Sequence, residues 1–222
     1  MARSSAAKAV CVAAMAAVLA SAVAATPHPT ASLFPTAAEL RAKFDDSDFA
    51  IDTNQIKGSR NGAGNIRGGN QGTFPVLGLP DVDTAFALVS LDENAHNLPH
   101  THPRASETLF LTKGKLEVFI VEENGPSPVR VIENTLRPGG LAVFPKGLVH
   151  GQRCVARDGC EAMVVLNSGD PGTVTVSARL CDAPVEAVAA ALGVSEAAAM
   201  RVCERISPNP ADGQPAKGKY YH

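Results

Sequence analysis

The feature that most constrains the fold is a succession of short apolar runs between Asp83 and Leu180, each ended by a turn. The runs recur at close spacing with little helical periodicity, so they predict strands. They read TAFALVSL, ETLFLTKG, KLEVFIVEENG, VRVIENTL, RPGGLAVFPKG, EAMVVLNSGDPG and TVTVSARL. Several short strands at such spacing indicate an antiparallel sandwich or barrel of the jelly-roll kind. We therefore expect an all-β barrel over residues 81–180.

The chain before the barrel, residues 26–80, predicts an arm or a long loop rather than a separate domain. It is rich in Pro, Gly, Asn and Thr, which are typical of turns and loops. One short helix is expected near residues 36–44, and a loose segment from Lys57 to Gly72.

The chain after the barrel predicts a short α-helical C-terminal extension over residues 181–206. Pro184 opens a first helix, Gly193 ends it and Ser195 caps a second one. The polar, Pro-rich residues 207–222 predict a flexible tail. The expected fold class is thus all-β with C-terminal helices.

Residues 1–25 read as a cleaved secretory signal peptide. Arg3 and Lys8 precede a run of small apolar residues, and Ala22-Val23-Ala24 offers a cleavage site. A membrane anchor is the alternative, but the run is of marginal length for a span and Pro27 follows it at once. We expect a secreted protein with no membrane association after cleavage.

Charge argues against a nucleic-acid partner. The chain has 20 basic and 22 acidic residues, and removal of the first 25 residues leaves 18 basic against 22 acidic ones. The mature chain is therefore mildly acidic and carries no basic block of the kind that binds a polyanion.

Four cysteines remain after signal cleavage, and an even number in an oxidising compartment favours disulfides. Cys154 and Cys160 flank a predicted hairpin loop, so we favour one bridge there and a second between Cys181 and Cys203. Buried free thiols are the alternative.

Two histidines and a glutamate in the run HTHPRASE raise the question of a metal site. A lone His-x-His pair is common on solvated strands. In a strand, however, His100 and His102 point to the same side, which can be the interior of a barrel. Glu107 in that interior would be costly without a cation.

The missing ligand is expected on a later strand, where His150 follows a Pro-Lys-Gly turn. Three imidazoles and one carboxylate leave two positions of an octahedron open. Such nitrogen and oxygen ligation suits Mn²⁺ or Fe²⁺, while Zn²⁺ and Ni²⁺ stay open.

The run from His100 to Glu107 with Gly114 after it, then Gly139 and the segment PKGLVH ending at His150, resembles the two cupin motifs. The chain is similar to germins, germin-like proteins and spherulins over roughly residues 40–206. The similarity rests on the sequence PHTHPRASE, the secretion signal and the C-terminal helices.

By this resemblance, His100, His102, Glu107 and His150 would be manganese ligands. The C-terminal helices would pack between subunits of a homo-oligomer, either a dimer or a hexamer built as a trimer of dimers. The protein would be extracellular, in the apoplast or the cell wall.

The chain departs from the germin pattern at several positions. Asn94 replaces a glycine six residues before the first ligand, and Cys154 replaces an asparagine four residues after the last. The amino-terminal cysteine pair of plant germins is missing. Oxalate oxidation in germins depends on two asparagines; Asn97 matches one, but the run near Ala87 offers no second amide.

We therefore rank superoxide, a small anionic substrate, above oxalate. Superoxide dismutation asks for a redox-active manganese ion with an open coordination position. The alternative is a non-enzymatic extracellular storage, wall-associated or ligand-binding cupin. A metal-dependent isomerase or dioxygenase also stays open, because fold does not fix function.

Overall fold

The structure is a computed structural model that describes residues 34–61, 63–125 and 128–206. The expected signal peptide and the expected tail lie outside these residues. The chain divides into two compact units, Met1–Thr36 and Ala37–His222, and every element named below belongs to the second.

The described strands are short, and most coincide with the predicted apolar runs. They are β1 (Ser59–Asn61), β2 (Gly64–Gly69), β3 (Ala85–Leu91), β4 (His96–Thr101), β5 (Glu107–Lys113), β6 (Leu116–Val121), β7 (Val131–Leu136), β8 (Leu141–Phe144), β9 (Val149–Cys154), β10 (Cys160–Leu166) and β11 (Val174–Thr175).

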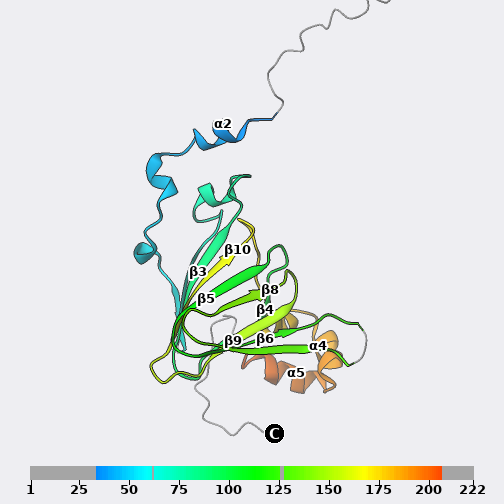
Figure 1. Cartoon of the computed structure of the whole chain (residues 1–222). Helices are drawn as coiled ribbons and strands as arrows, with labels where there is room; N and C mark the ends of the chain where they lie inside the picture. The colour runs from blue at the N-terminus through cyan, green and yellow to red at the C-terminus, as the bar shows by residue number, and fades with distance from the viewer. Residues whose placement is uncertain (1–33, 62, 126–127, 207–222) are drawn as a thin grey trace, which may run out of the picture. The chain divides into compact units, whose positions relative to one another are not determined.

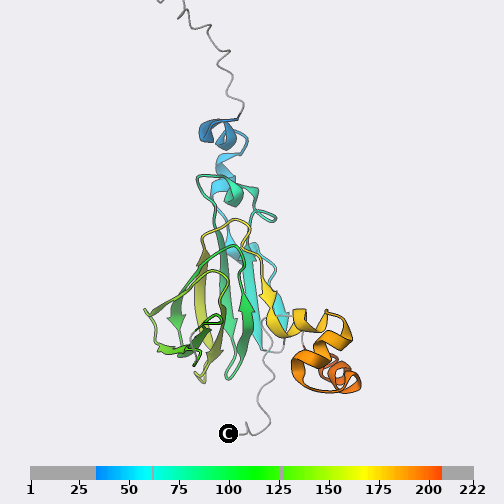
Figure 2. The same ribbon diagram turned by 90° about the vertical axis from the view of Figure 1, so that its right-hand side faces the viewer.

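Short helices precede and follow the strands. Those before β3 are α2 (Ala37–Arg41) and the 3-10 helices η1 (Asp46–Phe49), η2 (Thr53–Gln55) and η3 (Pro75–Gly78). Those after β11 are α3 (Val176–Cys181), α4 (Val185–Leu192) and α5 (Glu196–Cys203), which Figure 2 shows as one group.

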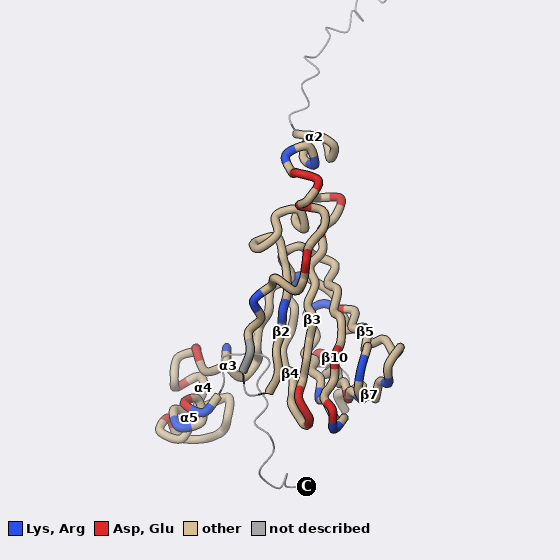
Figure 3. Tube along the Cα trace, turned by 90° about the vertical axis from the view of Figure 1, so that its left-hand side faces the viewer, with Lys and Arg blue, Asp and Glu red and all other residues tan. Residues whose placement is uncertain are grey.

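In the described residues the strands form two antiparallel sheets, as a jelly roll requires (Figure 1). A six-stranded sheet has the order β1-β2-β3-β10-β5-β8, and a five-stranded sheet has the order β11-β4-β9-β6-β7. The expected jelly-roll architecture is confirmed. Figure 3 shows β3, near the middle of the larger sheet, free of charged residues along its length.

The core lies between the two sheets because the strands alternate buried and exposed residues. In β10 the residues Cys160, Ala162, Val164 and Leu166 are buried, and the three between them are exposed. The core cluster also includes Leu109, Leu111, Leu116 and Phe144, each no more than 1% exposed.

The turn between β5 and β6 depends on Gly114, whose φ is +91°. A β-carbon at this position would lie 2.5 Å from the carbonyl oxygen of Gly159. Only glycine fits both the backbone conformation and the close approach of the neighbouring loop.

The prediction of a loose segment from Lys57 to Gly72 is wrong in part, because β1 and β2 lie within it. β2 pairs with β3 from Gly64↔Leu91 to Gly69↔Phe86 and so extends the larger sheet. Glycine is depleted in strands, so the glycine-rich sequence of β2 did not predict a strand. At Gly68 a β-carbon would lie 2.9 Å from the carbonyl of Phe86, so the close pairing itself favours glycine. The exact bounds of the arm, barrel and extension stay a prediction.

The predicted strand over residues 173–180 is also wrong in part. Only Val174 and Thr175 are strand, and α3 follows directly. The β-branched residues end at Val176, and after Ser177 come Ala178, Arg179 and Leu180, which favour helices.

The two C-terminal helices are confirmed, with α3 as an additional one before them. Pro184 precedes α4, Gly193 ends it with a φ of +65°, and the side chain of Ser195 accepts a hydrogen bond from the Ala198 amide at the start of α5. The helices share a small core around Val188 and Ala199.

Both favoured disulfides are present. Cys154 is bonded to Cys160 across the β9–β10 turn, and Cys181 at the end of α3 is bonded to Cys203 at the end of α5. Among the described residues, the helices are too short or too polar to cross a bilayer.

Candidate metal centre

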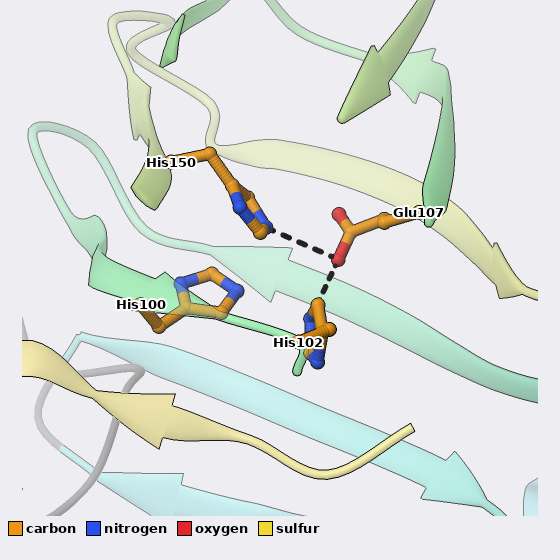
Figure 4. A group of neighbouring side chains, drawn as sticks. All are labelled: His100, His102, Glu107 and His150. Carbon is orange, nitrogen blue, oxygen red and sulfur yellow. Dashed lines mark hydrogen bonds and ion pairs between the residues drawn. The ribbon is translucent and has the colours of Figure 1, made fainter. Parts of the chain in front are cut away.

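The four predicted ligand side chains come from three strands and both sheets. His100 lies on β4, and His102 follows the end of that strand. Glu107 is the first residue of β5 in the other sheet, and His150 lies on β9. His100 and His150 are register partners, because β4 and β9 are adjacent. Figure 4 shows the four side chains pointing toward one another.

The four side chains form a compact buried cluster. One potential ligand atom from each lies within 4.8 Å of the others. Nε2 of His102 is 2.9 Å from Oε2 of Glu107, and Nε2 of His150 is 3.5 Å from the same oxygen. The exposed fraction of each residue is between 1% and 8%. Such a concentration of imidazoles around one buried carboxylate is what the sequence predicted.

Backbone carbonyls fix the orientation of all three imidazoles. The Nδ1 atoms of His100, His102 and His150 lie 2.7, 2.6 and 2.9 Å from the carbonyl oxygens of Leu98, Gly172 and Leu148. A carbonyl oxygen can only accept, so each Nδ1 carries a proton. Each Nε2 is therefore the ring atom that faces the cluster and can bind a metal.

Glu107 is held as a carboxylate despite its burial. Burial alone would raise its pKa, but the hydrogen bond from His102 and the neighbouring imidazoles outweigh it and lower the pKa to about 2. The pKa of His102 is raised, because its bonds to Glu107 and to the Gly172 carbonyl outweigh the effect of burial. In the metal-free protein the negative charge of Glu107 is thus paired with a proton on His102, and it becomes available to a metal that displaces this proton.

His100 supplies a neutral donor, and His150 supplies a nitrogen that faces the carboxylate. Burial, with His150 close by, lowers the pKa of His100 to about 4. Nε2 of His150 is buried and lies 3.5 Å from Oε2 of Glu107, but it has no hydrogen-bond partner among the described residues. This is a cost unless something else binds the nitrogen. A divalent cation would satisfy this nitrogen and the carboxylate together, so the residues fit a bound metal.

Three neighbouring side chains, Phe144, Gln152 and Thr173, support the cluster. The ring of Phe144 stacks on His150 with ring centres 4.5 Å apart. Nε2 of Gln152 lies 3.5 Å from Oε1 of Glu107, and Oγ1 of Thr173 lies 3.4 Å from Nδ1 of His102. Gln152 was detectable, because it is two residues after His150 on the same strand and so shares its face. Thr173 gave no sequence signal.

Asn97 and Ala87 line the same cavity as the cluster, whereas His96 does not. Asn97 is 7% exposed, and its Oδ1 has no hydrogen-bond partner in the part of the chain that the structure describes. Ala87, on β3, places a methyl group in the cavity wall, at the position where the resemblance to germins would put the second oxalate-binding asparagine. His96 instead lines a separate surface groove with Glu117 and Arg153.

The cavity has a volume of about 290 Å³. His100, His102 and Glu107 form one part of its wall, and residues of β2, β3 and β10 form most of the rest. The site can therefore hold a metal ion and a small ligand beside it.

Comparisons with known proteins agree with this arrangement. The family model for the cupin domain matches residues 26–200. Germin-like protein subfamily 1 member 6 of Arabidopsis thaliana is 32% identical over 164 residues, which is 68% of this chain and 71% of that protein. Spherulin-1A of Physarum polycephalum is 29% identical over 194 residues, 85% of this chain and 76% of that protein.

Solved structures with the same fold include an oxalate oxidase, with a TM-score of 0.67 and 23% identity over 74% of this chain and 84% of that one. The oxalate decarboxylase of Bacillus subtilis has a TM-score of 0.59 and 21% identity, over 74% of this chain and 46% of that one. At these identities the likeness shows the fold alone.

Proposed function

The chain belongs to the germin-like and spherulin-like members of the cupin family, and from this premise we propose that it is a secreted manganese-binding protein with redox activity of the superoxide dismutase type. The observation that carries the proposal is the convergence of three imidazole Nε2 atoms and one carboxylate in a buried cluster.

Manganese is the metal proposed, with iron, zinc and nickel as competitors. His100, His102, Glu107 and His150 would hold it through nitrogen and oxygen atoms, and the described cysteines are all in disulfides and offer no thiolate. When bound, manganese supplies a centre that exchanges one electron with superoxide and has open coordination positions.

The protein residues have separate tasks at this centre. The carbonyls of Leu98, Gly172 and Leu148 keep the three imidazoles in one tautomer. The Glu107 carboxylate offsets part of the metal charge, and Phe144 fixes the ring of His150. The site is thus preorganised, which keeps the cost of binding the metal low.

Oxalate oxidation has weaker support in this chain. Asn97 lines the cavity, but the opposite wall offers the methyl group of Ala87 instead of an amide. A non-enzymatic storage, wall-associated or ligand-binding cupin is the alternative function, because metal binding alone does not require turnover.

Secretion and self-association are part of the proposal. Two disulfides among the described residues suit an oxidising compartment such as the extracellular space, the apoplast or the cell wall. On α4, α5 and the turn between them, apolar side chains stay exposed in the isolated chain, namely Leu192, Val194, Met200 and Val202. They support a homo-oligomer, a dimer or a hexamer, with the helices between subunits.

The test is superoxide dismutation by the full chain after loading with Mn²⁺. We expect activity in the loaded wild type and none in a His150→Ala variant, with a His96→Gln variant as active as the wild type. A loaded wild type that holds stoichiometric manganese without dismutase activity would favour the non-enzymatic alternative.

A further inference from the structure

The three imidazoles of the cluster are oriented by different parts of the chain. The carbonyls that accept from His100 and His150 each belong to the residue two positions earlier in the sequence. His102, which lies beyond the end of β4, donates instead to the carbonyl of Gly172, 70 residues later. The orientation of His102 therefore depends on where a separate loop lies.

That loop is the connection between β10 and β11, residues 167–173. Its first half is fixed to the barrel, because the carbonyl of Gly169 accepts from the Gln71 amide at 2.8 Å and its amide donates to the Asp83 carboxylate at 2.6 Å. Beyond the loop, β11 pairs with β4. The Gly172 carbonyl lies between these two anchors.

Arg104 makes three hydrogen bonds to the middle of the loop. Its backbone amide donates to the carbonyl of Pro171 at 3.1 Å, its Nε donates to the carbonyl of Asp170 at 2.6 Å, and its Nη2 donates to Oδ1 of Asp170 at 2.6 Å. Across the described chain, the hydrogen bonds that reach residues 170–172 from outside the loop come from Arg104 and His102 alone.

Gly172 lets the loop lie directly against Arg104. Its φ is +67°, and a β-carbon there would lie 2.9 Å from Nη2 of Arg104 and 3.0 Å from Cγ of Pro103. A larger residue would strain the backbone and displace the guanidinium from the loop. The residue that supplies the carbonyl to His102 is thus also the one that Arg104 packs against.

The contact between Arg104 and Asp170 lies at the surface, where their side chains are 52% and 55% exposed. An exposed ion pair contributes little to stability by itself. Its effect here is on geometry, because the planar guanidinium bonds the carbonyl and the carboxylate of one residue at the same time. Such a two-point contact fixes the orientation of the loop as well as its distance.

We propose that Arg104 is a positioning residue for the metal centre. It holds the middle of the 167–173 loop so that the Gly172 carbonyl stays in place to accept from Nδ1 of His102, which keeps Nε2 of the same ring directed at the cluster. The consequence for manganese affinity rests on the proposed function, whereas the hydrogen bond can be measured on the metal-free protein.

The first measurement is the exchange of the imidazole Nδ1 protons with water, followed by NMR on the metal-free full chain. We expect Arg104→Ala to speed the exchange at His102 about tenfold, because the loop opens more often. The protons of His100 and His150 should exchange as in the wild type, since their carbonyl partners lie on other segments.

Lys113→Ala is the matched control. It removes the ion pair between Lys113 and Glu161, whose side chains are 51% and 54% exposed and so resemble those of the Arg104 pair. This pair lies away from the 167–173 loop, on β5 and β10. The variant should leave all three Nδ1 protons unchanged.

The second measurement is the affinity of the full chain for Mn²⁺ by calorimetry. Arg104→Ala is expected to lower this affinity about tenfold, at the lower end of the range for groups that support a metal ligand. Arg104→Lys keeps the charge and the backbone hydrogen bond but lacks the two-point contact, so it should show the same changes to a smaller extent. It also decides the question if the alanine variant does not fold.

Unchanged exchange at His102 in the Arg104 variants would overturn the positioning role. An equal rise at all three histidines would overturn it as well, because it would show a general loss of stability. A wild type that binds no manganese would contradict the proposed function instead, and the exchange rates would still show whether Arg104 holds the loop.

Discussion

His102 carries the proton that competes most directly with a bound metal. In the metal-free protein its Nε2 donates to Glu107 and its Nδ1 donates to the Gly172 carbonyl, so the ring is doubly protonated. These bonds raise its pKa above the ordinary value of 6.5. A metal must displace the proton on Nε2.

Manganese affinity is therefore expected to fall as the pH falls through the raised pKa of His102. One displaced proton corresponds to about tenfold in affinity per pH unit. Glu107, with a pKa of about 2, and His100, with a pKa of about 4, add little to this dependence above pH 5. Calorimetric titration with Mn²⁺ between pH 5 and 8 measures it.

His96→Gln is the matched control, because His96 lies outside the cluster. It should reproduce the pH profile of the wild type. An affinity that stays constant across this pH range would show that His102 is not a ligand.

Two residues that depart from the germin pattern have a structural reason. Asn94, in place of a glycine, has a φ of +61°, a conformation that asparagine tolerates better than most residues. Cys154, in place of an asparagine, is fully buried and bonded to Cys160. Neither change disturbs the cluster.

Among the helices and strands, short apolar runs ended by turns predicted most strands. Elements whose conformation depends on a neighbouring segment were missed. β2 exists because β3 pairs with it, and its glycines give no strand signal of their own. The start of α3 shows the same limit: Val176 begins a helix although it continues a run of β-branched residues. Local propensity does not predict the secondary structure of a segment when tertiary contacts determine it.

The disulfide between Cys181 and Cys203 ties α3 to α5, and its removal tests how the helices depend on it. A Cys181→Ala, Cys203→Ala double variant is expected to lose about 3 kcal/mol of unfolding free energy, from the loop entropy of the unfolded chain. Hydrogen exchange should show faster opening of α4 and α5.

Manganese binding by this variant should equal that of the wild type, because the cluster lies on β4, β5 and β9. Loss of metal together with the helices would show that the helical extension supports the site directly.

At the scale of the whole molecule, the site is assembled from both sheets. The sequence was sufficient to name the four clustered side chains, since their residue types and spacing match known motifs. It did not reveal the carbonyls of Leu98, Leu148 and Gly172, because any residue supplies a carbonyl. The apolar cavity wall was equally hidden, since it joins strands far apart in the chain.

Self-association is expected to depend on the exposed apolar residues of the C-terminal helices. A Leu192→Glu, Met200→Glu double variant should be monomeric at concentrations where the wild type is a dimer or hexamer, because two buried charges would be unpaired. Light scattering coupled to size exclusion measures the mass.

Asn124→Glu, which adds a charge at an exposed turn residue after β6, is the control and should keep the wild-type mass. A monomeric wild type would contradict the proposed oligomer, and an oligomeric double variant would place the interface elsewhere.

The most direct test of the metal centre is elemental analysis of the full chain beside a His100→Ala, His150→Ala double variant. We expect close to one manganese per chain in the wild type and none in the variant. A wild type without metal, or a variant that keeps it, would contradict the assignment of the four side chains as ligands.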